Sequence, residues 1–438
     1  MMKIDSGSEG LERSLVASLV IVNSILCCLS LAWLAPYDAF HIFYDGTQLP
    51  AALLSVTAFA VVGLLFIFVP FSFGYFVGFH FYMMVLGYLW LSRFSDLAYD
   101  HRTAEISVAI SAIAFLAPAL LVRPAIPQLV VLSETVFEKL LIAMIALGAG
   151  VIAVGAAYSF KIVSLLDIYS FRDQLQFPTL LNYLIGITST ALLPFAFACY
   201  VLRGAFGRAA AILLLLLLFY PITLSKSAFF APFWLIYMTV FSKALGNRIA
   251  VLLSLTLPIL VGVILMMFFP AYAYPYHHIV NLRLFAIPPN ALDFYNDFFA
   301  HHAHTHFCQI SFLHDVMSCP YDEPLSILMQ KAYNTGYLNA SLLATEGIAS
   351  VGLLLAPVSA LVCGLVIALA NGLSAGLPSR FVLISAALFP VALSNIPLTT
   401  VLLTHGAGAL FLLWYVMPRD FLSSPRPKTA APTVSAMA

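Results

Sequence analysis

The chain has 438 residues, of which 62% are hydrophobic and only 9% are charged. Soluble domains carry roughly 25% charged residues, so this composition indicates an integral membrane protein. The 19 basic and 19 acidic residues balance, which gives no support for nucleic-acid binding, because that function needs a basic surface. Twelve spans of about 20 residues would use about 240 positions, which excludes a separate soluble catalytic domain.

Apolar runs bounded by charge or proline predict an all-α polytopic membrane protein with about 12 transmembrane helices. The run at 229–241 is short, so we expect 11 to 13 crossings and a re-entrant or tilted pair of half-helices there. The predicted spans are 15–35, 49–69, 73–91, 106–122, 140–160, 183–202, 209–224, 229–241, 249–269, 348–368, 381–398 and 401–416.

These spans divide the chain into helices one to nine (1–269), one large extramembrane loop (270–347), helices ten to twelve (348–416) and a tail predicted to be disordered (417–438). With a cytoplasmic N-terminus, 12 of the 19 Lys and Arg residues fall on the cytoplasmic side and 7 on the other. The positive-inside rule therefore places both termini in the cytoplasm and the large loop outside.

Cysteine usage differs between the spans and the loop. Four cysteines lie within predicted spans, where they are expected to act as small apolar packing residues: Cys27, Cys28, Cys199 and Cys363. Cys308 and Cys319 lie in the large loop. If the loop faces an oxidising compartment, a disulfide between them is expected, and two free thiols packed under the loop are the alternative.

No Walker A, GxGxxG, HExxH, GxSxG or CxxC motif is present, so the sequence gives no motif for ATP, dinucleotide or zinc-peptidase chemistry. The first polar candidate is Arg172, which follows Tyr169 between the fifth and sixth spans. A guanidinium at the interface can bind a phosphate while its stem stays in the apolar layer. The alternative is a snorkelling arginine paired with Asp167 or Asp173.

Lys226 is the second candidate, because it interrupts a long apolar stretch. A lysine in hydrocarbon is costly unless it faces a cavity or a counter-ion. The alternative is a lysine in a hairpin turn that reaches the lipid headgroups.

The third candidate group begins with Arg283, just past the ninth span. Asp293 and Asp297 follow with helical i, i+4 spacing, and Tyr295 lies between them. Carboxylates and aromatic rings are the groups with which proteins bind sugars, since rings stack on C–H surfaces and carboxylates accept hydroxyl protons. An interfacial amphipathic helix without a ligand would have a similar pattern.

The fourth candidate group is histidine-rich. In an extended segment, His302, His304 and His306 would share one face, which makes a metal site geometrically feasible. No Cys or Glu completes a known ligand spacing, so we predict no metal and no other cofactor. One histidine acting as a general base is the favoured use.

Four segments together resemble Wzy-type O-antigen and oligosaccharide repeat-unit polymerases. These are Tyr-Ser-Phe-Arg at 169–172, Ser-Lys-Ser at 225–227, Arg-x-x-x-Ile-Pro at 283–288, and the returning segment at 339–352, which contains Asn339 and Glu346. The resemblance implies a GT-C-like architecture in the bacterial inner membrane. It implies transfer of a polyprenyl-diphosphate-linked oligosaccharide onto another lipid-linked repeat unit at the periplasmic face, and it leaves room for a chain-length regulator protein as a partner.

On this interpretation the candidate catalytic residues are Arg172, Lys226, Arg283 and Glu346. The candidate substrate-binding residues are Tyr169, Asp293, Tyr295, Asp297, His304 and Asn339. The leaving diphosphate needs cations as the anomeric C–O bond breaks. We therefore expect Arg172 and Arg283 to converge on one cavity beneath a folded cap, with short helices around 293–299 and 326–333.

Two other classes of function remain open on the sequence alone. An O-antigen ligase would share the architecture and differ in its acceptor. A metal-dependent glycosyltransferase that uses polyprenyl-phosphate sugars would be expected to have paired or DxD-like carboxylates in the first outer loop, where only Asp38 and Asp45 occur. A polysaccharide or lipid transporter would usually show two related halves with charge buried at mid-membrane, and the sequence has no visible internal repeat.

Overall fold

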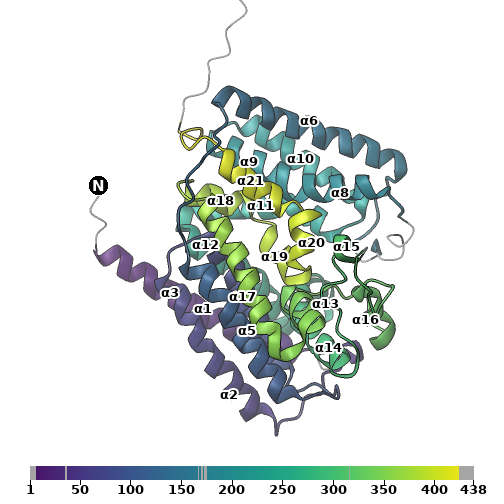
Figure 1. Cartoon of the computed structure of the whole chain (residues 1–438). Helices are drawn as coiled ribbons and strands as arrows, with labels where there is room; N and C mark the ends of the chain where they lie inside the picture. Colours follow the sequence, from purple (N-terminus) through teal and green to yellow (C-terminus); the bar gives the residue numbers. More distant parts are fainter. Residues whose placement is uncertain are drawn as a thin grey trace, which may run out of the picture.

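The structure is a computed structural model that describes residues 6–34, 37–165, 167–168, 171, 175–314 and 316–423. Every regular element in these residues is a helix (Figure 1). Ten helical segments within them are long and apolar enough to cross a membrane. The chain is therefore an all-α, multi-pass membrane protein, as its composition predicted.

Nine of these segments correspond to the first nine predicted spans, and a short helix, η1 (Asp38–Phe40), lies between the first two. In chain order they are α1 (Ser6–Ala32); α2 (Leu49–Ala60) with η2 (Val61–Leu64) and α3 (Leu65–Phe68); α4 (Phe73–Leu91); α5 (His101–Leu121); α6 (Glu134–Tyr158); α8 (Thr179–Ile187) with η3 (Thr188–Leu192) and α9 (Leu193–Leu202); α10 (Phe206–Thr223); α11 (Lys226–Leu245); and α12 (Asn247–Phe268).

Three of these helices begin at a side chain that accepts a hydrogen bond from the first turn. Ser72 precedes α4, Asp100 precedes α5, and Ser133 precedes α6. Each of these caps satisfies a backbone N–H that has no partner within the helix, which stabilises a helix start by about 1 kcal/mol. These polar residues therefore fix where the chain enters the bundle.

Charged side chains gather at two ends of the bundle, as expected if a membrane covers its middle. One end holds the ion pairs Arg248–Glu12 and Arg203–Glu138. The other end holds Arg93–Glu105 and Lys331–Glu323. Arg248 and Arg203 are among the 12 basic residues predicted on the cytoplasmic side, and Arg93 and Lys331 are among the 7 predicted on the other side. The absolute orientation in a membrane stays a prediction.

The prediction of two further full spans at 381–398 and 401–416 is wrong. After the tenth span, which consists of η5 (Leu343–Ala349) and α17 (Ser350–Leu373), the chain forms four short helices: α18 (Ser379–Ser385), α19 (Phe389–Asn395), α20 (Leu398–Leu403) and α21 (Ala407–Val416). The helix is interrupted at 386–388, just before Pro390, then at Pro397, and again at Gly406, which adopts a φ of 78° that favours glycine. Hydrophobicity alone does not reveal such breaks.

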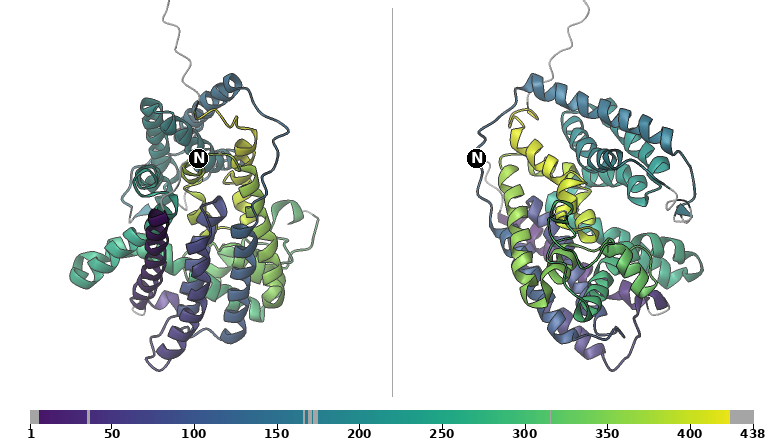
Figure 2. Two further views of the ribbon diagram at one scale, coloured as in Figure 1. Left: turned by 90° about the vertical axis from the view of Figure 1, so that its left-hand side faces the viewer. Right: turned by 45° about the vertical axis from the view of Figure 1, so that its right-hand side comes forward.

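The four short helices form a hairpin inside the protein. In Figure 1, α19 and α20 lie near the middle of the molecule, while α18 and α21 lie toward the end where α17 finishes. α18 packs on α9, α19 packs on α4 and α21 contacts α17, and Figure 2 shows the yellow C-terminal helices beside the green α17. The backbone of Leu132, before α6, bonds to Val416, so the hairpin returns to the end from which it entered.

The expected irregularity at 229–241 is absent. α11 runs without interruption over 20 residues, although Pro232 lies inside it. The proline is in the second turn of the helix, where it removes few internal hydrogen bonds. In the described residues, the short half-helices expected here occur instead in the C-terminal hairpin.

The segment 270–347, predicted to lie wholly outside the membrane, begins by turning back into the bundle. α13 (Pro270–Tyr276), η4 (His277–Ala286) and α14 (Ile287–His301) follow one another with no loop between them. The amide of Asn281 donates to Ser30 (3.1 Å) and to the carbonyl of Ile259 (3.2 Å). Ile259 lies nine residues before the end of α12, about 13 Å along the helix. η4 is therefore a re-entrant element between α1 and α12.

The outer part of this segment is folded. It contains α15 (Ser311–His314) and α16 (Leu325–Tyr333). The two short helices predicted around 293–299 and 326–333 are confirmed as parts of α14 and α16. α14 is buried along almost its whole length and packs on α4, so it is not an interfacial helix with a free polar face.

Candidate functional site

Three segments with widened, π-helical turns surround the C-terminal hairpin. η3 lies against the break of the hairpin at Gly406. A Cβ added to Gly406 would be 2.9 Å from the side chain of Ala191 in η3, and one added to Gly186, just before η3, would be 2.3 Å from the carbonyl oxygen of Thr404. η4 carries Arg283 and η5 carries Glu346. π-helical turns interrupt regular helical bonding and are frequent at functional sites. The convergence of all three makes this hairpin the candidate site.

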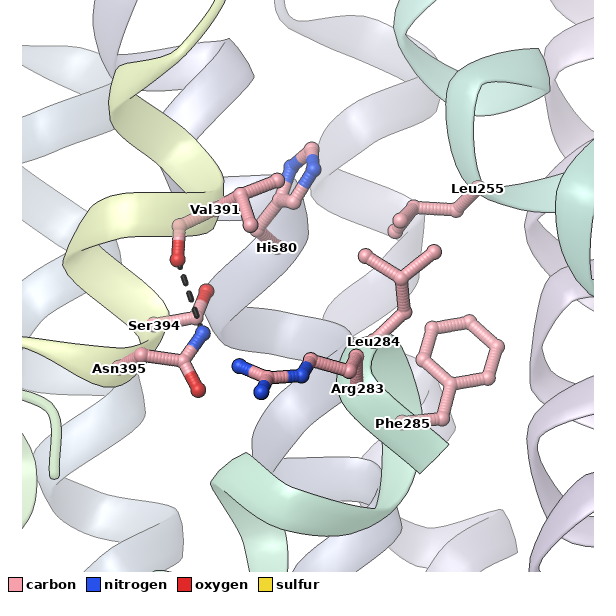
Figure 3. Close-up of a pocket in the computed structure, with 8 residues that line it drawn as sticks. All are labelled: His80, Leu255, Arg283, Leu284, Phe285, Val391, Ser394 and Asn395. Carbon is pink, nitrogen blue, oxygen red and sulfur yellow. Dashed lines mark hydrogen bonds between the residues drawn. The ribbon is translucent and has the colours of Figure 1, made fainter. Parts of the chain in front are cut away.

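Arg283 lines a pocket at the end of α19. Residues of α4, α12 and η4 form its other walls, and its lining is His80, Leu255, Leu284, Phe285, Val391, Ser394 and Asn395. Figure 3 shows the guanidinium extending from η4 toward Asn395. The arginine is half-buried. His80 lies eleven residues before the end of α4, so the pocket is about 16 Å along that helix, well inside the bundle.

His80 is a functional candidate that sequence reasoning missed. It belongs to α4, a helix in which every residue is buried. Its Nδ1 lies 3.2 Å from the carbonyl oxygen of Phe76, and its Nε2 has no hydrogen-bond partner among the described residues. A histidine within an aromatic, apolar run gives no motif, but a polar residue inside a predicted span is itself a signal of function.

Glu346 contacts α20, the second helix of the hairpin turn, whereas Arg283 lies beside α19. Its Oε1 accepts hydrogen bonds from the backbone N–H (2.9 Å) and the hydroxyl (2.8 Å) of Thr399, in the first turn of α20. Its Oε2 is buried without a hydrogen-bond partner in the described part of the chain. Tyr295 of α14 lies beside it. Glu346 therefore holds the broken helix in place rather than facing a solvent-filled cavity.

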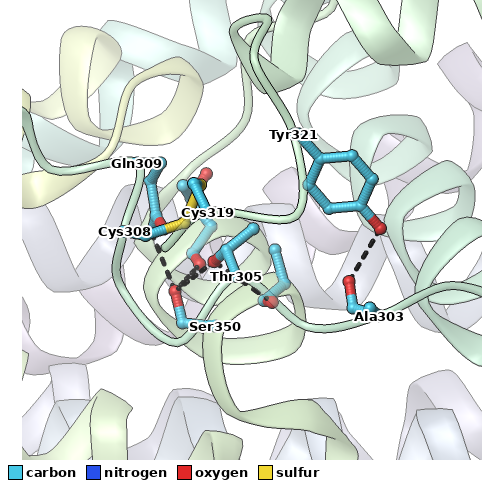
Figure 4. The surroundings of a disulfide bond; sticks show 9 residues. Ala303, Thr305, Cys308, Gln309, Cys319, Tyr321 and Ser350 are labelled. Atoms are coloured by element: carbon cyan, nitrogen blue, oxygen red, sulfur yellow. Dashed lines mark hydrogen bonds between the residues drawn. A yellow bond between two sulfur atoms is a disulfide. The ribbon is translucent and has the colours of Figure 1, made fainter. Parts of the chain in front are cut away.

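A disulfide-closed loop is fastened to the start of α17 (Figure 4). Cys308 and Cys319 are bonded, with their Cα atoms 5.4 Å apart. The backbone N–H of Thr305 donates to the carbonyl of Ala349 (2.8 Å), and that of His306 donates to the carbonyl of Ser350 (3.1 Å). Helical partners for these carbonyls are missing because η5 and the kink at Gly352 interrupt the helix. The loop supplies the donors instead.

The histidine tract has structural contacts. His304 lies over Gly352, where an added Cβ would be 2.8 Å from its Nε2. His302 stacks on Phe298 with ring centroids 4.0 Å apart, and His301 contacts the carbonyl of Asp297. No group of three or more metal-binding side chains comes together in the described residues.

Asp293 and Asp297 share one helix face, as their spacing predicted, but that face is covered. Ser95 (2.6 Å) and Tyr99 donate to the two oxygens of Asp293, which is fully buried. The backbone of Ala98 (3.0 Å) and the hydroxyl of Tyr333 (2.6 Å) donate to Asp297. In this structure both carboxylates fasten α14 to its neighbours, and Asp293 is not presented to a sugar.

Three more of the predicted residues are described and do not line the pocket: Lys226, Asn339 and Tyr295. Lys226 begins α11 at the turn after α10 and acts electrostatically on His278, at the start of η4. Asn339 is exposed in the outer segment, and Tyr295 is buried. Tyr169 and Arg172 lie outside the described residues, so the predicted convergence of Arg172 with Arg283 stays a prediction.

Comparisons with protein families, with characterised proteins and with solved structures find no match to this chain.

Replacing both Cys308 and Cys319 by Ser should loosen the loop from the start of α17. A disulfide that closes a loop of this length restrains the unfolded chain by about 3 kcal/mol. We expect faster hydrogen exchange at the amides of Thr305 and His306, measured by mass spectrometry on the oxidised protein and the variant. Cys28→Ser is the control, and unchanged exchange in the double variant would show that the loop is held without the bridge.

Replacing Asp293 by Asn should flatten the pH dependence of stability. Burial raises the pKa of Asp293 from 3.8 to about 6. A carboxyl group whose pKa is higher in the folded than in the unfolded state stabilises the fold fully below pH 3.8, where both states are protonated. This contribution to the free energy of unfolding is lost as the pH rises through 6. The wild type should lose about 1 kcal/mol between pH 5 and pH 7 relative to Asp293→Asn. Thermal unfolding in detergent at both pH values measures this difference, and parallel curves would contradict it.

Glu346→Ala should destabilise the protein by about 1–3 kcal/mol, because the Thr399 N–H would lose its partner inside the bundle. Glu346→Gln should cost less than about 1 kcal/mol, since an amide oxygen can still accept both bonds. Thermal unfolding of the two variants gives the comparison. If Gln is as damaging as Ala, the negative charge of Glu346 and not its role as an acceptor is what the fold requires.

Proposed function

We propose that this chain is a glycosyltransferase that polymerises oligosaccharide repeat units linked to polyprenyl diphosphate, at the outer face of a bacterial inner membrane. The products would be polysaccharides such as O-antigen, capsule or exopolysaccharide. The sequence resemblance to Wzy-type polymerases motivates the proposal. The position of Arg283 is the observation that carries it.

Arg283 is held inside the bundle by a re-entrant helix. An ionisable side chain inside a membrane-spanning bundle is by default a candidate for function. Arginine binds phosphate with two parallel hydrogen bonds, and its aliphatic stem tolerates an apolar surrounding. A substrate whose lipid tail lies in the bilayer and whose diphosphate reaches this pocket would suit such a position.

The proposed reaction is a displacement at the anomeric carbon. The acceptor hydroxyl forms the new C–O bond, the bond to the diphosphate oxygen breaks, and the electron pair leaves with the diphosphate. The hydroxyl proton passes to a base. Arg283 would neutralise the charge that develops on the leaving group, which is the largest contribution a fixed cation can make to such a step.

The outer segment supports a site that opens to an oxidising compartment. The Cys308–Cys319 disulfide lies in it, and disulfides persist outside the cytoplasm. The same segment contacts α17 beside η5, which carries Glu346. This arrangement suits a cap that closes over a substrate approaching from the outer face.

One observation favours transport as a second candidate function. The C-terminal hairpin is built from discontinuous helices, and transporters often bind substrates and coupling ions where such helices break. A transporter of lipid-linked glycans would bind the same diphosphate but would break no glycosidic bond. The two functions therefore differ in their products.

Arg283→Ala should abolish long polysaccharide chains while the protein is still made and folded. The loss of one contact that stabilises a transition state slows a reaction by about 10²–10³-fold. Arg283→Lys should rescue only partly, because an ammonium keeps the charge but not the paired geometry. The measurement is glycan chain length on gels from cells whose only copy is the variant.

Arg380→Ala is the matched control. Arg380 is also half-buried within the bundle, but it binds Ser242 (3.2 Å) and Thr239 (2.9 Å) at the opposite end. Single repeat units at the cell surface from Arg283→Ala would support a polymerase. Lipid-linked single units retained on the cytoplasmic face would support the transporter, and normal long chains would contradict both roles for Arg283.

A further inference from the structure

A groove lies between α9, α10 and α11, at the end of the bundle that carries the Arg203–Glu138 ion pair. It holds about 210 Å³, the space of about 15 water-sized groups. α10 packs on both α9 and α11 (Figure 1), and two small residues of α10, Ala209 and Ala210, line the groove and leave the space open. It shares no lining residue with the pocket beside Arg283.

The lining of the groove is apolar. Two residues of α9, four of α10 and three of α11 form it, and eight of these nine side chains are apolar. The exception is Thr239, whose hydroxyl donates to the carbonyl of Leu235 (2.7 Å). Its own carbonyl accepts from Arg380 (2.9 Å) and Ser242 (3.2 Å). The polar side chain of the lining is therefore satisfied within the protein, so the groove suits hydrocarbon and not water.

The groove opens on the outside of the membrane-spanning helices. Phe206 is 69% exposed, Val240 is 55% exposed and Ile236 is 45% exposed. Phe206 is the first residue of α10, and Val240 lies five residues before the end of α11. The groove reaches Leu213, seven residues along α10 and about 10 Å deeper. Since α10 and α11 are both candidate membrane spans, a hydrocarbon chain can enter this groove from the lipid layer.

A basic side chain lies one helical turn beyond the groove. Lys243 follows Val240 by three residues, which places both on one face of α11, and Lys243 is exposed. It is among the 12 basic residues predicted on the cytoplasmic side. Basic residues at this membrane surface attract the anionic lipids of the cytoplasmic leaflet. An apolar groove with a lysine at its end matches a lipid that has an acyl chain and a negatively charged headgroup.

We propose that this groove binds one acyl chain of an anionic phospholipid from the cytoplasmic leaflet, with the headgroup phosphate beside Lys243. The chain fills the space at Ala209 and Ala210 and supplies the van der Waals contacts that the open walls lack. The polyprenyl chain of the proposed substrate is a second source of hydrocarbon, but its diphosphate belongs at the outer face, away from Lys243. This inference does not depend on the proposed function.

The test measures lipid binding to the full-length protein in detergent by native mass spectrometry. The probes are phosphatidylglycerol, which is anionic, and phosphatidylcholine, which is zwitterionic, with the same acyl chains. We expect one lipid to be held more tightly than the rest, and phosphatidylglycerol to bind this site about 5-fold more tightly than phosphatidylcholine. This ratio corresponds to about 1 kcal/mol, the contribution of one basic residue near an anionic membrane surface.

Two variants fill the groove from different helices. Ala210→Phe fills it from α10 and Val240→Phe fills it from α11, and both positions are exposed, which leaves room for a larger side chain. Each should remove the tightly held lipid of either kind. Ala211→Phe is the matched control, because Ala211 is exposed on the same helix but is not a lining residue. Thermal unfolding without added lipid verifies that each variant is folded.

Lys243→Gln tests the headgroup separately. It should keep the tightly held lipid but bind phosphatidylglycerol and phosphatidylcholine equally. Lys139→Gln is the control, since Lys139 is exposed on α6 at the same end of the bundle and α6 contributes no lining residue. The control should keep the 5-fold preference.

The proposal is overturned if the wild type holds no lipid tightly, or if both groove-filling variants bind lipid as the wild type does. Equal loss in Ala211→Phe would also show that the groove is not the site. A full preference for phosphatidylglycerol in Lys243→Gln would refute the headgroup assignment. Undecaprenyl phosphate is added as a competitor. If it displaces phosphatidylglycerol from the wild type, the groove holds a polyprenyl chain and the assigned occupant is wrong.

Discussion

A helix that breaks inside a bilayer leaves backbone groups that no water can reach, and each of them needs a partner from the protein. The centre of this molecule is organised by that requirement. Glu346 accepts the exposed N–H of Thr399 at the start of α20, and the outer loop donates to the carbonyls of Ala349 and Ser350. The polar residues that supply hydrogen bonds to these backbone groups are also polar residues that could take part in chemistry. The candidate site lies here because the helices break here.

The same requirement explains why Arg283 and Glu346 do not form an ion pair in the structure. They approach the turn between α19 and α20 from separate elements, η4 and η5, and each contacts a different part of it. One carboxylate oxygen of Glu346 accepts from the backbone and hydroxyl of Thr399, whereas Arg283 lines the pocket at the end of α19. The two residues therefore contact different helices of the hairpin.

Composition and hydropathy predicted the helical, membrane-spanning class and ten of the spans, because those properties depend on local sequence. They failed at the C-terminal hairpin, where the apolar run at 381–398 is interrupted at 386–388 and ends at Pro397, and the run at 401–416 is interrupted at Gly406. They also failed at η4, because burial of Asn281 depends on polar partners from α1 and α12 that sequence spacing cannot reveal. Asp293 and Asp297 were correctly placed on one face, but only the fold shows that loop 95–99 covers it. His80 belongs to no sequence motif. It became a candidate only because the structure shows that its buried Nε2 has no hydrogen-bond partner in the described residues.

The short helices of the hairpin also constrain how the protein is assembled. Helices of six to ten residues are far too short to cross about 30 Å of hydrocarbon, so α18 to α21 cannot be inserted one by one into lipid. They follow the ten long segments in the chain, so the surfaces of α4, α9 and η3 that receive them are already made when they emerge from the ribosome. The last helices are therefore expected to fold against the earlier helices and not directly in lipid. Damage to those receiving surfaces would appear as failed biogenesis of the C-terminal hairpin, before any question of catalysis arises.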